Sequence, residues 1–203
     1  MRYSREISRS HTRIRENVPI HAPPRKLWGF MLTPPRRILT TKKLIRAAEI
    51  LSIPIYATTQ NRARLGETCA ELSIPNAVEH VDKTAFSMWI PAISQHFSPD
   101  RPSEVVLVGI ESHICVTQTT LDLLANGHKV YVLADGVSSC NPQEIPIALA
   151  RLRAAGAIVT SSESFLYELM GDAAIPEFKQ IAGLVKETSK DTKEVVATLL
   201  SKM

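Results

Sequence analysis

The sequence predicts a three-layer α/β/α protein built on a parallel β-sheet. Two stretches, Glu104–Ile110 and Lys129–Asp135, are almost continuously apolar, which is typical of strands buried on both faces. Each of them is followed by a helical pattern that ends at a glycine. Strands that alternate with helices in this way form parallel sheets covered on both sides. The 203 residues, 44% hydrophobic and 22% charged, are enough for one domain with a substantial core.

The other elements follow from hydrophobic spacing along the chain. Apolar residues from Leu39 to Leu51 recur at helical intervals, and the β-branched run Ile53–Thr58 after them predicts a buried strand. Helices are predicted at Ile114–Asn126, before Gly127, and at Gln143–Ala155, before Gly156. A short strand and two helices should complete the fold, at residues 157–160, 164–169 and 175–185.

The N-terminal segment differs from the rest in charge and pattern. Met1–Arg37 holds nine Lys and Arg against two Glu, whereas the remaining residues hold fifteen basic and eighteen acidic side chains. Five of the thirteen prolines also lie in this segment. We therefore expect a basic, disordered extension at 1–34, one domain at 35–188 and a C-terminal tail at 189–203. Within the extension, Leu27–Leu32 is the only stretch apolar enough for a strand.

Several classes of protein are not favoured. No apolar run approaches the roughly 18 residues that span a bilayer, so we expect no membrane insertion. The three cysteines are too few and too irregularly spaced for a disulfide framework or a zinc site, and His80, His96 and His128 lack metal-ligand spacing, so we expect neither metal nor cofactor. The basic N-terminus lacks the interleaved aromatic residues typical of nucleic-acid binding, and we expect no nucleic-acid partner.

Cys115 is the sharpest candidate for chemistry. Ligand sites of parallel sheets lie at the carboxyl ends of the strands, and Cys115 stands where a predicted strand turns into a helix. The helix N-terminus should lower the pKa of its thiol, so we expect it to alkylate faster than Cys69 and Cys140. The alternative is that Cys115 serves as a small buried hydrophobe, the role we assign to the other two cysteines.

Lys83 and His113 are weaker candidates. A lysine beside Cys115 would stabilise its thiolate or polarise a carbonyl oxygen, although an isolated lysine is more often a solvated surface residue. His113 lies two residues before Cys115 and is either its base or a polar residue of the turn.

Several segments together resemble a known family. GIESHICVTQTTLDLLANGHKVYVLADGVSS resembles the nucleophile strand, turn and helix of the isochorismatase-like cysteine hydrolases. VDKTAFSM resembles their lysine segment, and TTQNRARLGETCAEL resembles the loop after their second strand. The closing stretch GDAAIPEFKQIAGLVKE resembles the eukaryotic isochorismatase-domain-containing proteins. The resemblance covers about residues 35–188 and implies a Rossmann-like parallel sheet.

The resemblance also implies a site and a reaction. Cys115 would be the nucleophile and Lys83 its electrostatic partner, acting on a small amide-like or imide-like carbonyl substrate through an acyl-enzyme. A non-proline cis peptide is expected between Ile110 and Glu111. The expected substrate-binding residues are Ile110, Glu111, His113, Phe86 and Gln60. The family also implies a homo-oligomer.

One part of the family pattern is missing. The family carries a catalytic aspartate at the end of its first strand, but this chain has no aspartate before Asp82. We expect an atypical first strand and impaired turnover. Glu111 is a poor substitute as a base, and Asp135 should cap the turn at 138–141. The alternative hypothesis is an inactive family member that acts as a binding or oligomerisation module.

The chain carries two weak targeting signals. It ends in Ser201-Lys-Met203, which resembles the peroxisomal address SKL, so we expect a cytoplasmic or peroxisomal protein. The Arg- and Ser-rich, acid-poor N-terminus makes a mitochondrial location a third alternative.

Overall fold

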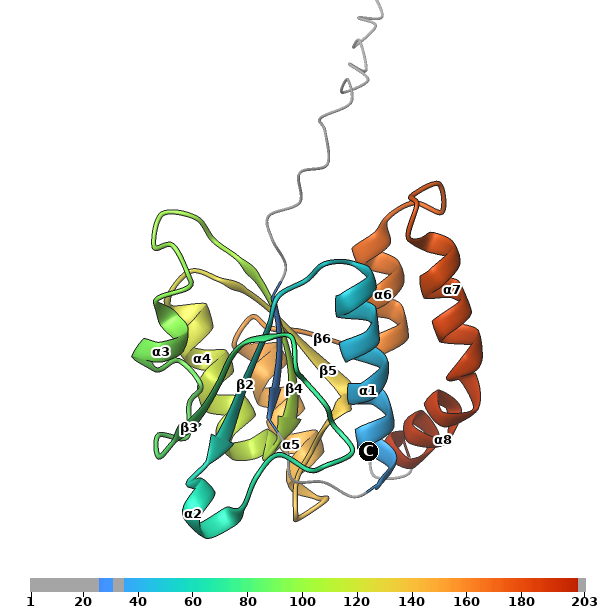
Figure 1. Cartoon of the computed structure of the whole chain (residues 1–203). Helices are drawn as coiled ribbons and strands as arrows, with labels where there is room; N and C mark the ends of the chain where they lie inside the picture. Colours follow the sequence, from blue (N-terminus) through green and yellow to red (C-terminus); the bar gives the residue numbers. More distant parts are fainter. Residues whose placement is uncertain (1–25, 31–34, 201–203) are drawn as a thin grey trace, which may run out of the picture.

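A computed structural model describes residues 26–30 and 35–200 of the chain. The described residues form a six-stranded sheet in the order β3-β2-β1-β4-β5-β6, in which every neighbouring pair is parallel (Figure 1). The strands are β1 (Lys26–Phe30), β2 (Ile55–Gln60), β3 (Ala77–Lys83), β4 (Glu104–Ile110), β5 (Lys129–Ser138) and β6 (Ile158–Thr160). The predicted α/β class with a parallel sheet is therefore confirmed.

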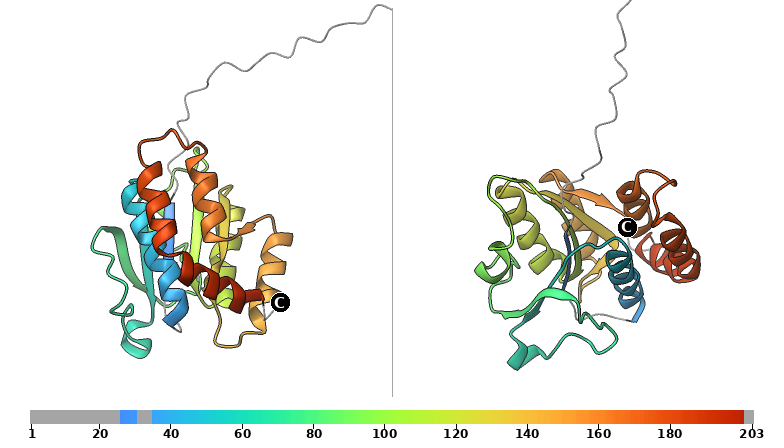
Figure 2. Two further views of the ribbon diagram at one scale, coloured as in Figure 1. Left: turned by 90° about the vertical axis from the view of Figure 1, so that its right-hand side faces the viewer. Right: turned by 45° about the horizontal axis from the view of Figure 1, so that its top comes forward.

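Helices cover both faces of the sheet. The larger ones are α1 (Pro35–Ile50), α4 (Thr117–Ala125), α5 (Glu144–Ala154), α6 (Ser162–Met170), α7 (Phe178–Glu187) and α8 (Ser189–Leu200). Two short ones, α2 (Arg62–Leu65) and α3 (Pro91–Ser94), follow β2 and β3. Figure 2 shows α1, α6 and α7 side by side over one face, and α3, α4 and α5 lie over the other.

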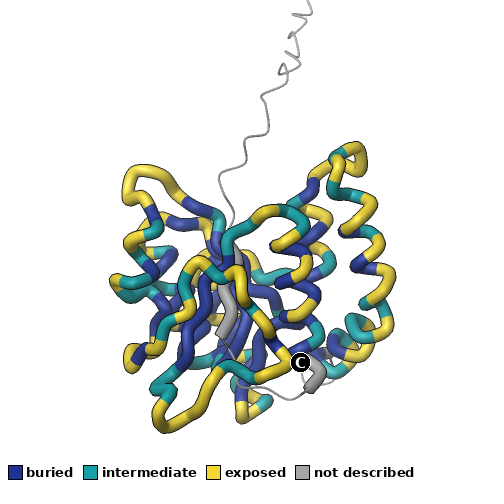
Figure 3. The backbone as a smooth tube through the Cα atoms, viewed as in Figure 1, coloured by how far each residue is buried: buried dark blue, intermediate teal, exposed yellow. Residues whose placement is uncertain are grey.

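Two apolar layers hold the sheet between the helices. Along β4, Val105 and Leu107 face the α3–α5 layer, while Val106 and Val108 face the α1, α6 and α7 layer. Successive side chains of a strand point to opposite faces, so a continuously apolar strand fills both layers at once. Figure 3 shows the resulting band of buried strands through the centre of the molecule.

Sequence patterning missed several elements. Strand β3 lies at the edge of the sheet, and its burial alternates along Ala77–Lys83 instead of giving a continuous apolar run. The segment 1–34 contains β1 (Lys26–Phe30), which overlaps the predicted stretch Leu27–Leu32. The segment 189–203 contains helix α8. The domain boundaries themselves stay a prediction.

Helix α8 packs against α1 and β5 through polar and apolar side chains. The Lys43 ammonium on α1 is buried and donates a 3.0 Å hydrogen bond to Thr192 Oγ1 on α8. Val195 and Leu199 are both buried, and Leu199 belongs to the apolar layer that also contains Cys115. The last helix therefore packs as part of the folded body.

Gly136 of β5 faces the Val108 side chain of β4 with no room for a Cβ atom. A Cβ atom built on it would lie 2.6 Å from Val108 Cγ1. We expect Gly136→Ala to destabilise the protein by about 1–3 kcal/mol through overpacking. Urea unfolding measures the effect. The control is Gly183→Ala in α7, where a Cβ meets nothing within 4 Å and alanine favours the helix. An equal loss in both variants would contradict a packing origin.

Candidate active site

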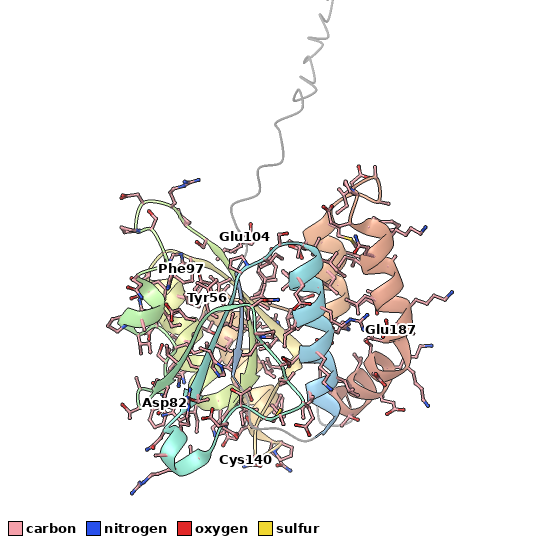
Figure 4. The ribbon with its side chains drawn as sticks, viewed as in Figure 1. Tyr56, Asp82, Phe97, Glu104, Cys140 and Glu187 are labelled. Carbon is pink, nitrogen blue, oxygen red and sulfur yellow. The ribbon has the colours of Figure 1, made fainter. Side chains whose placement is uncertain are left out.

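The candidate site lies at the carboxyl ends of the strands. Gln60 ends β2, Lys83 ends β3 and Ile110 ends β4, which leads into a π-helical turn, η1 (Ser112–Val116), that continues into α4. Figure 4 marks this end of the molecule by Asp82 and Cys140, which both lie toward the arrowheads of the strands. The parallel topology brings these strand ends together, and the site was predicted at this edge of the sheet.

Cys115 is the fourth residue of the π-helical turn. The backbone N–H of Val116 donates to the Glu111 carbonyl across 3.1 Å, which closes the wide turn. The side chain of Cys115 is 5% exposed and belongs to the apolar layer. The peptide bond between Ile110 and Glu111 is cis, as the family resemblance implied. The helical segment begins at Ser112, two residues before the predicted start at Ile114.

Lys83 is buried, with 4% exposure, and is not the solvated surface lysine that its isolated position in the sequence suggested. Its Nζ donates to the backbone carbonyls of Ala85 and Phe86, each across 2.9 Å. It also donates to Gln60 Oε1 across 2.5 Å. These three acceptors match the three hydrogens of an ammonium group, so the geometry suits a charged Lys83.

Gln60 connects the lysine to the cysteine. The same Oε1 that accepts from Lys83 lies 4.0 Å from Cys115 Sγ. The Lys83 ammonium and the Cys115 thiol are also close enough to influence each other's pKa. Two residues from distant segments of the chain thus lie close to the same Gln60 oxygen. The acceptors of Lys83 Nζ at Gln60, Ala85 and Phe86 are all carbonyl oxygens.

Thr119 is a residue of the site that sequence reasoning missed. Its buried hydroxyl donates to the Cys115 carbonyl across 2.6 Å and accepts the backbone N–H of Met88 across 2.9 Å. One side chain therefore connects the segment after Lys83 to the turn that carries Cys115. The signal was a hydroxyl residue one helical turn after the cysteine, where it reaches the carbonyl four residues back.

The expected low pKa of the Cys115 thiol is wrong. Burial raises the pKa of the thiol above its ordinary value, because desolvation disfavours the thiolate. The Lys83 ammonium and the backbone N–H of Glu111 lower it, and the Glu111 carboxylate adds a smaller increase. Burial likewise lowers the pKa of Lys83, against the opposing charges of Cys115 and Asp82. In the resting protein the thiol is therefore protonated at neutral pH.

This shift changes the expected order of alkylation. Cys140 is exposed and Cys115 is buried, so iodoacetamide should label Cys140 first at pH 7. Labelling of Cys115 should rise about tenfold per pH unit and level off only above the ordinary cysteine pKa. Peptide mapping of all three cysteines between pH 6 and 10 measures both rates. Saturation of Cys115 labelling below pH 8 would contradict the raised pKa.

Glu111 and His113 bind the strand-to-helix loop after β5. Glu111 Oε2 accepts the backbone N–H of Cys140 across 2.6 Å. His113 Nδ1 lies 2.9 Å from Ser139 Oγ, which is also 2.5 Å from Ser112 Oγ. These bonds fix the π-helical turn to the neighbouring loop and favour the turn-residue interpretation of His113 over the base.

Two other predicted residues have different roles from those expected. The Phe86 side chain is 51% exposed, while its backbone carbonyl binds Lys83. Asp135 lies inside β5 and does not cap the turn at 138–141: its carboxylate accepts the N–H and hydroxyl of Ser162 at the start of α6. The prediction for Asp135 was wrong because β5 continues three residues further than its apolar run.

The described part of the chain contains no group of three His, Cys, Asp or Glu residues arranged to hold a metal ion. Among the same residues, no helix combines the length and apolar character required to cross a bilayer.

Residues 34–164 match the isochorismatase domain family. The chain belongs to the isochorismatase family. The secreted isochorismatase effector Isc1 of Phytophthora sojae is 42% identical to this chain over 168 residues, which are 80% of each protein. Human isochorismatase domain-containing protein 2 is 38% identical over 160 residues, which are 78% of this chain and 77% of the human protein.

Solved structures show the same fold. The MAR1 ribonuclease of Caenorhabditis elegans superposes with a TM-score of 0.74 at 38% identity, covering 80% of this isochorismatase-family chain and 91% of the nematode protein. YcaC of Escherichia coli, described as an octameric hydrolase of unknown specificity, has a TM-score of 0.71 at 16% identity, covering 89% and 95% of the two chains. The YcaC likeness concerns the fold alone.

Proposed function

We propose that this isochorismatase-family protein is a cysteine hydrolase that acts on a small amide-like carbonyl substrate. The observation that carries the proposal is the Lys83–Gln60–Cys115 arrangement at the carboxyl edge of the sheet. The Lys83 ammonium and the Cys115 thiol both lie beside the carboxamide oxygen of Gln60, so a substrate carbonyl in that position would meet a cation and a nucleophile. A buried ammonium group and a buried thiol whose pKa values are both shifted, at the carboxyl edge of a parallel sheet, are typical of a catalytic site.

The reaction follows from the groups present. Cys115 Sγ, as thiolate, forms a bond to the carbonyl carbon, and the C–N bond then breaks as the nitrogen takes up a proton and leaves as ammonia or an amine. The resulting thioester is hydrolysed by water to a carboxylic acid and the free thiol. The charge of Lys83 favours the thiolate, and the backbone N–H of Glu111 stabilises negative charge at the sulfur.

A specific observation also favours the alternative of an inactive family member that acts as a binding module. The sequence has no aspartate before Asp82, and the acceptors of Lys83 Nζ at Gln60, Ala85 and Phe86 are carbonyl oxygens, which do not exchange a proton near neutral pH. General acid–base assistance is typically worth about 10² to 10⁴ in rate. We therefore expect acylation and deacylation to be slow in this chain, with the acyl-enzyme as the species most easily detected.

The experiment that tests the proposal uses a panel of small primary amides, imides and matching esters. Intact-mass spectrometry detects an acyl adduct, peptide mapping assigns it to a cysteine, and ammonia release measures turnover. An adduct on Cys115 with slow ammonia release is the expected result. Absence of any adduct and any ammonia across the panel would favour the binding module.

We also propose that the protein forms a homo-oligomer. Large apolar side chains are exposed on helices over both faces of the sheet, among them Ile147 on α5 and Tyr167 on α6. A partner subunit that packs against either face would remove one of them from water. Light scattering coupled to size-exclusion chromatography tests the proposal, and a monomeric mass at micromolar concentration would contradict it.

A further inference from the structure

The segment that follows β3 binds the Lys83 ammonium but has no regular structure of its own. Residues 84–88 lie between β3 and α3 and belong to no helix or strand. Two of their carbonyls, those of Ala85 and Phe86, each accept from Lys83 Nζ across 2.9 Å. Both contacts join residues two or three positions apart in the chain. They therefore set the local shape of the segment but do not fix it to the opposite side of the pocket.

Thr119 fixes the end of this segment to helix α4. Its side-chain oxygen accepts the backbone N–H of Met88 across 2.9 Å, and its hydroxyl donates to the Cys115 carbonyl across 2.6 Å. Thr119 is 1% exposed and Met88 is 3% exposed, so water does not readily replace either bond. A hydroxyl can donate one hydrogen and accept another at the same time. A single side chain thus couples the lysine segment to the backbone of the candidate nucleophile.

Thr120, the next residue of α4, provides an internal comparison. It is also buried, and its hydroxyl donates to the Val116 carbonyl four residues back, across 2.7 Å. Such bonds to the preceding turn are common for threonine in helices and do not themselves indicate a function. Thr119 makes the same kind of bond and accepts the Met88 N–H in addition. The contact with Met88 is therefore what distinguishes Thr119 from its neighbour.

The contacts close a ring around the pocket. On one side, Lys83 Nζ binds the Phe86 carbonyl, and two residues further on Met88 binds Thr119, which in turn binds the Cys115 carbonyl. On the other side, Gln60 Oε1 accepts from Lys83 Nζ and lies 4.0 Å from Cys115 Sγ. The ring holds the cation and the sulfur at a fixed separation. Loss of the Met88 contact would open it on the side of residues 84–88.

We infer that Thr119 is a positioning residue, which holds the Lys83 ammonium beside Cys115 by fastening residues 84–88 to the backbone of the nucleophile. The inference rests on the proposed function, because it assigns Thr119 a part in that reaction. Thr119 acts through Lys83: it keeps the carbonyls of Ala85 and Phe86 in place, and these carbonyls orient the ammonium.

The test follows the pH profile of Cys115 alkylation by iodoacetamide, with peptide mapping. The Cys115 thiol is faced by the Lys83 ammonium, which favours the thiolate, and by the Glu111 carboxylate, which opposes it. Thr119→Val removes the hydroxyl at nearly constant volume, so residues 84–88 should shift and the Lys83 charge should act more weakly on the sulfur. The profile should move to higher pH by about one unit. The rate of acyl-adduct formation should fall about tenfold or more.

Two further variants separate positioning from helix stability. Thr119→Ser keeps the hydroxyl and should restore the alkylation profile and the adduct rate of the parent protein. Thr120→Val removes an equally buried hydroxyl that bonds to the preceding turn, and it should leave both properties unchanged. The inference is overturned if Thr119→Val causes no shift, or if Thr120→Val causes a shift of the same size.

A double-variant cycle tests whether Thr119 acts through Lys83. In the Lys83→Met background the cation is already absent, so Thr119→Val should cause no further shift of the alkylation profile. A shift that adds to that of Lys83→Met would show that Thr119 acts on the cysteine by another route, and the inference would then fail.

Failure of the inference and failure of the proposed function remain distinguishable, because alkylation needs no substrate. If the parent protein forms no acyl adduct, the proposed function fails, while the alkylation profiles still decide the role of Thr119. Thermal unfolding monitored by circular dichroism checks that each variant is folded. If Thr119→Val is unfolded, Thr119→Ala takes its place, since alanine also lacks the hydroxyl and adds no bulk. A shifted profile in that variant supports the inference, and an unchanged profile overturns it.

Discussion

Replacing Cys115 by serine is expected to abolish the acyl adduct and to lower turnover by about 10⁴-fold or more. Serine is close in size to cysteine and keeps the contacts of the π-helical turn, but its hydroxyl ionises far less readily than a thiol. Lys83 donates hydrogens and Gln60 carries an amide, so neither of these two neighbours is a base that would deprotonate it. Intact mass and ammonia release measure the two effects.

The control for this experiment is Cys69→Ser. Cys69 is partly buried in the opposite apolar layer, beside α1 and β3, and takes no part in the pocket. Its replacement should leave the adduct on Cys115 and the rate of ammonia release unchanged. Full activity in Cys115→Ser would show that another group is the nucleophile, and the cysteine hydrolase proposal would be abandoned.

Replacing Lys83 by methionine should lower the rate of acylation by about 10² to 10³. Methionine matches the length of the lysine stem but removes the charge that favours the Cys115 thiolate. The pKa of Cys115, measured by alkylation, should therefore rise further in the variant. A merely structural lysine would leave that pKa unchanged, so the pH profile separates the two roles.

Lys179→Met is the matched control, because Lys179 is an exposed lysine on α7. It should leave both the acylation rate and the alkylation profile as in the parent protein. Arginine at position 83 is not a conservative change, since its planar fork does not reproduce three acceptors around one nitrogen. Normal acylation in Lys83→Met would remove the electrostatic role assigned to Lys83.

The part of the fold that sequence patterning predicted well is the part buried on both faces. Strand β4 is continuously apolar because it packs against both helical layers, and the helix after it ends at Ala125, two residues before Gly127. Strand β3 escaped prediction because an edge strand with alternating burial presents polar and apolar residues in turn. Helix α8 lay in a segment that we expected to be a tail.

For the candidate site too, some features could be predicted from the sequence and others could not. Cys115 and Lys83 were identified by motif resemblance, and the topology brings them together through Gln60. The direction of the Cys115 pKa shift was mispredicted because the argument counted the helix N-terminus but not the depth of burial. Desolvation depends on what distant segments place over the sulfur, and hydrophobic spacing along the chain does not record it.

The position of β1 has a consequence for how the chain folds during synthesis. The first strand of the sheet is also an inner one, with β2 on one side and β4 on the other. A nascent chain presents β1 before the other described strands, but its pairing from Lys26 to Val105 requires translation through β4. Until then one edge of β1 stays open to other strands. Ribosome-bound intermediates should therefore depend on chaperones until β4 has emerged and β1 can pair with both of its neighbours.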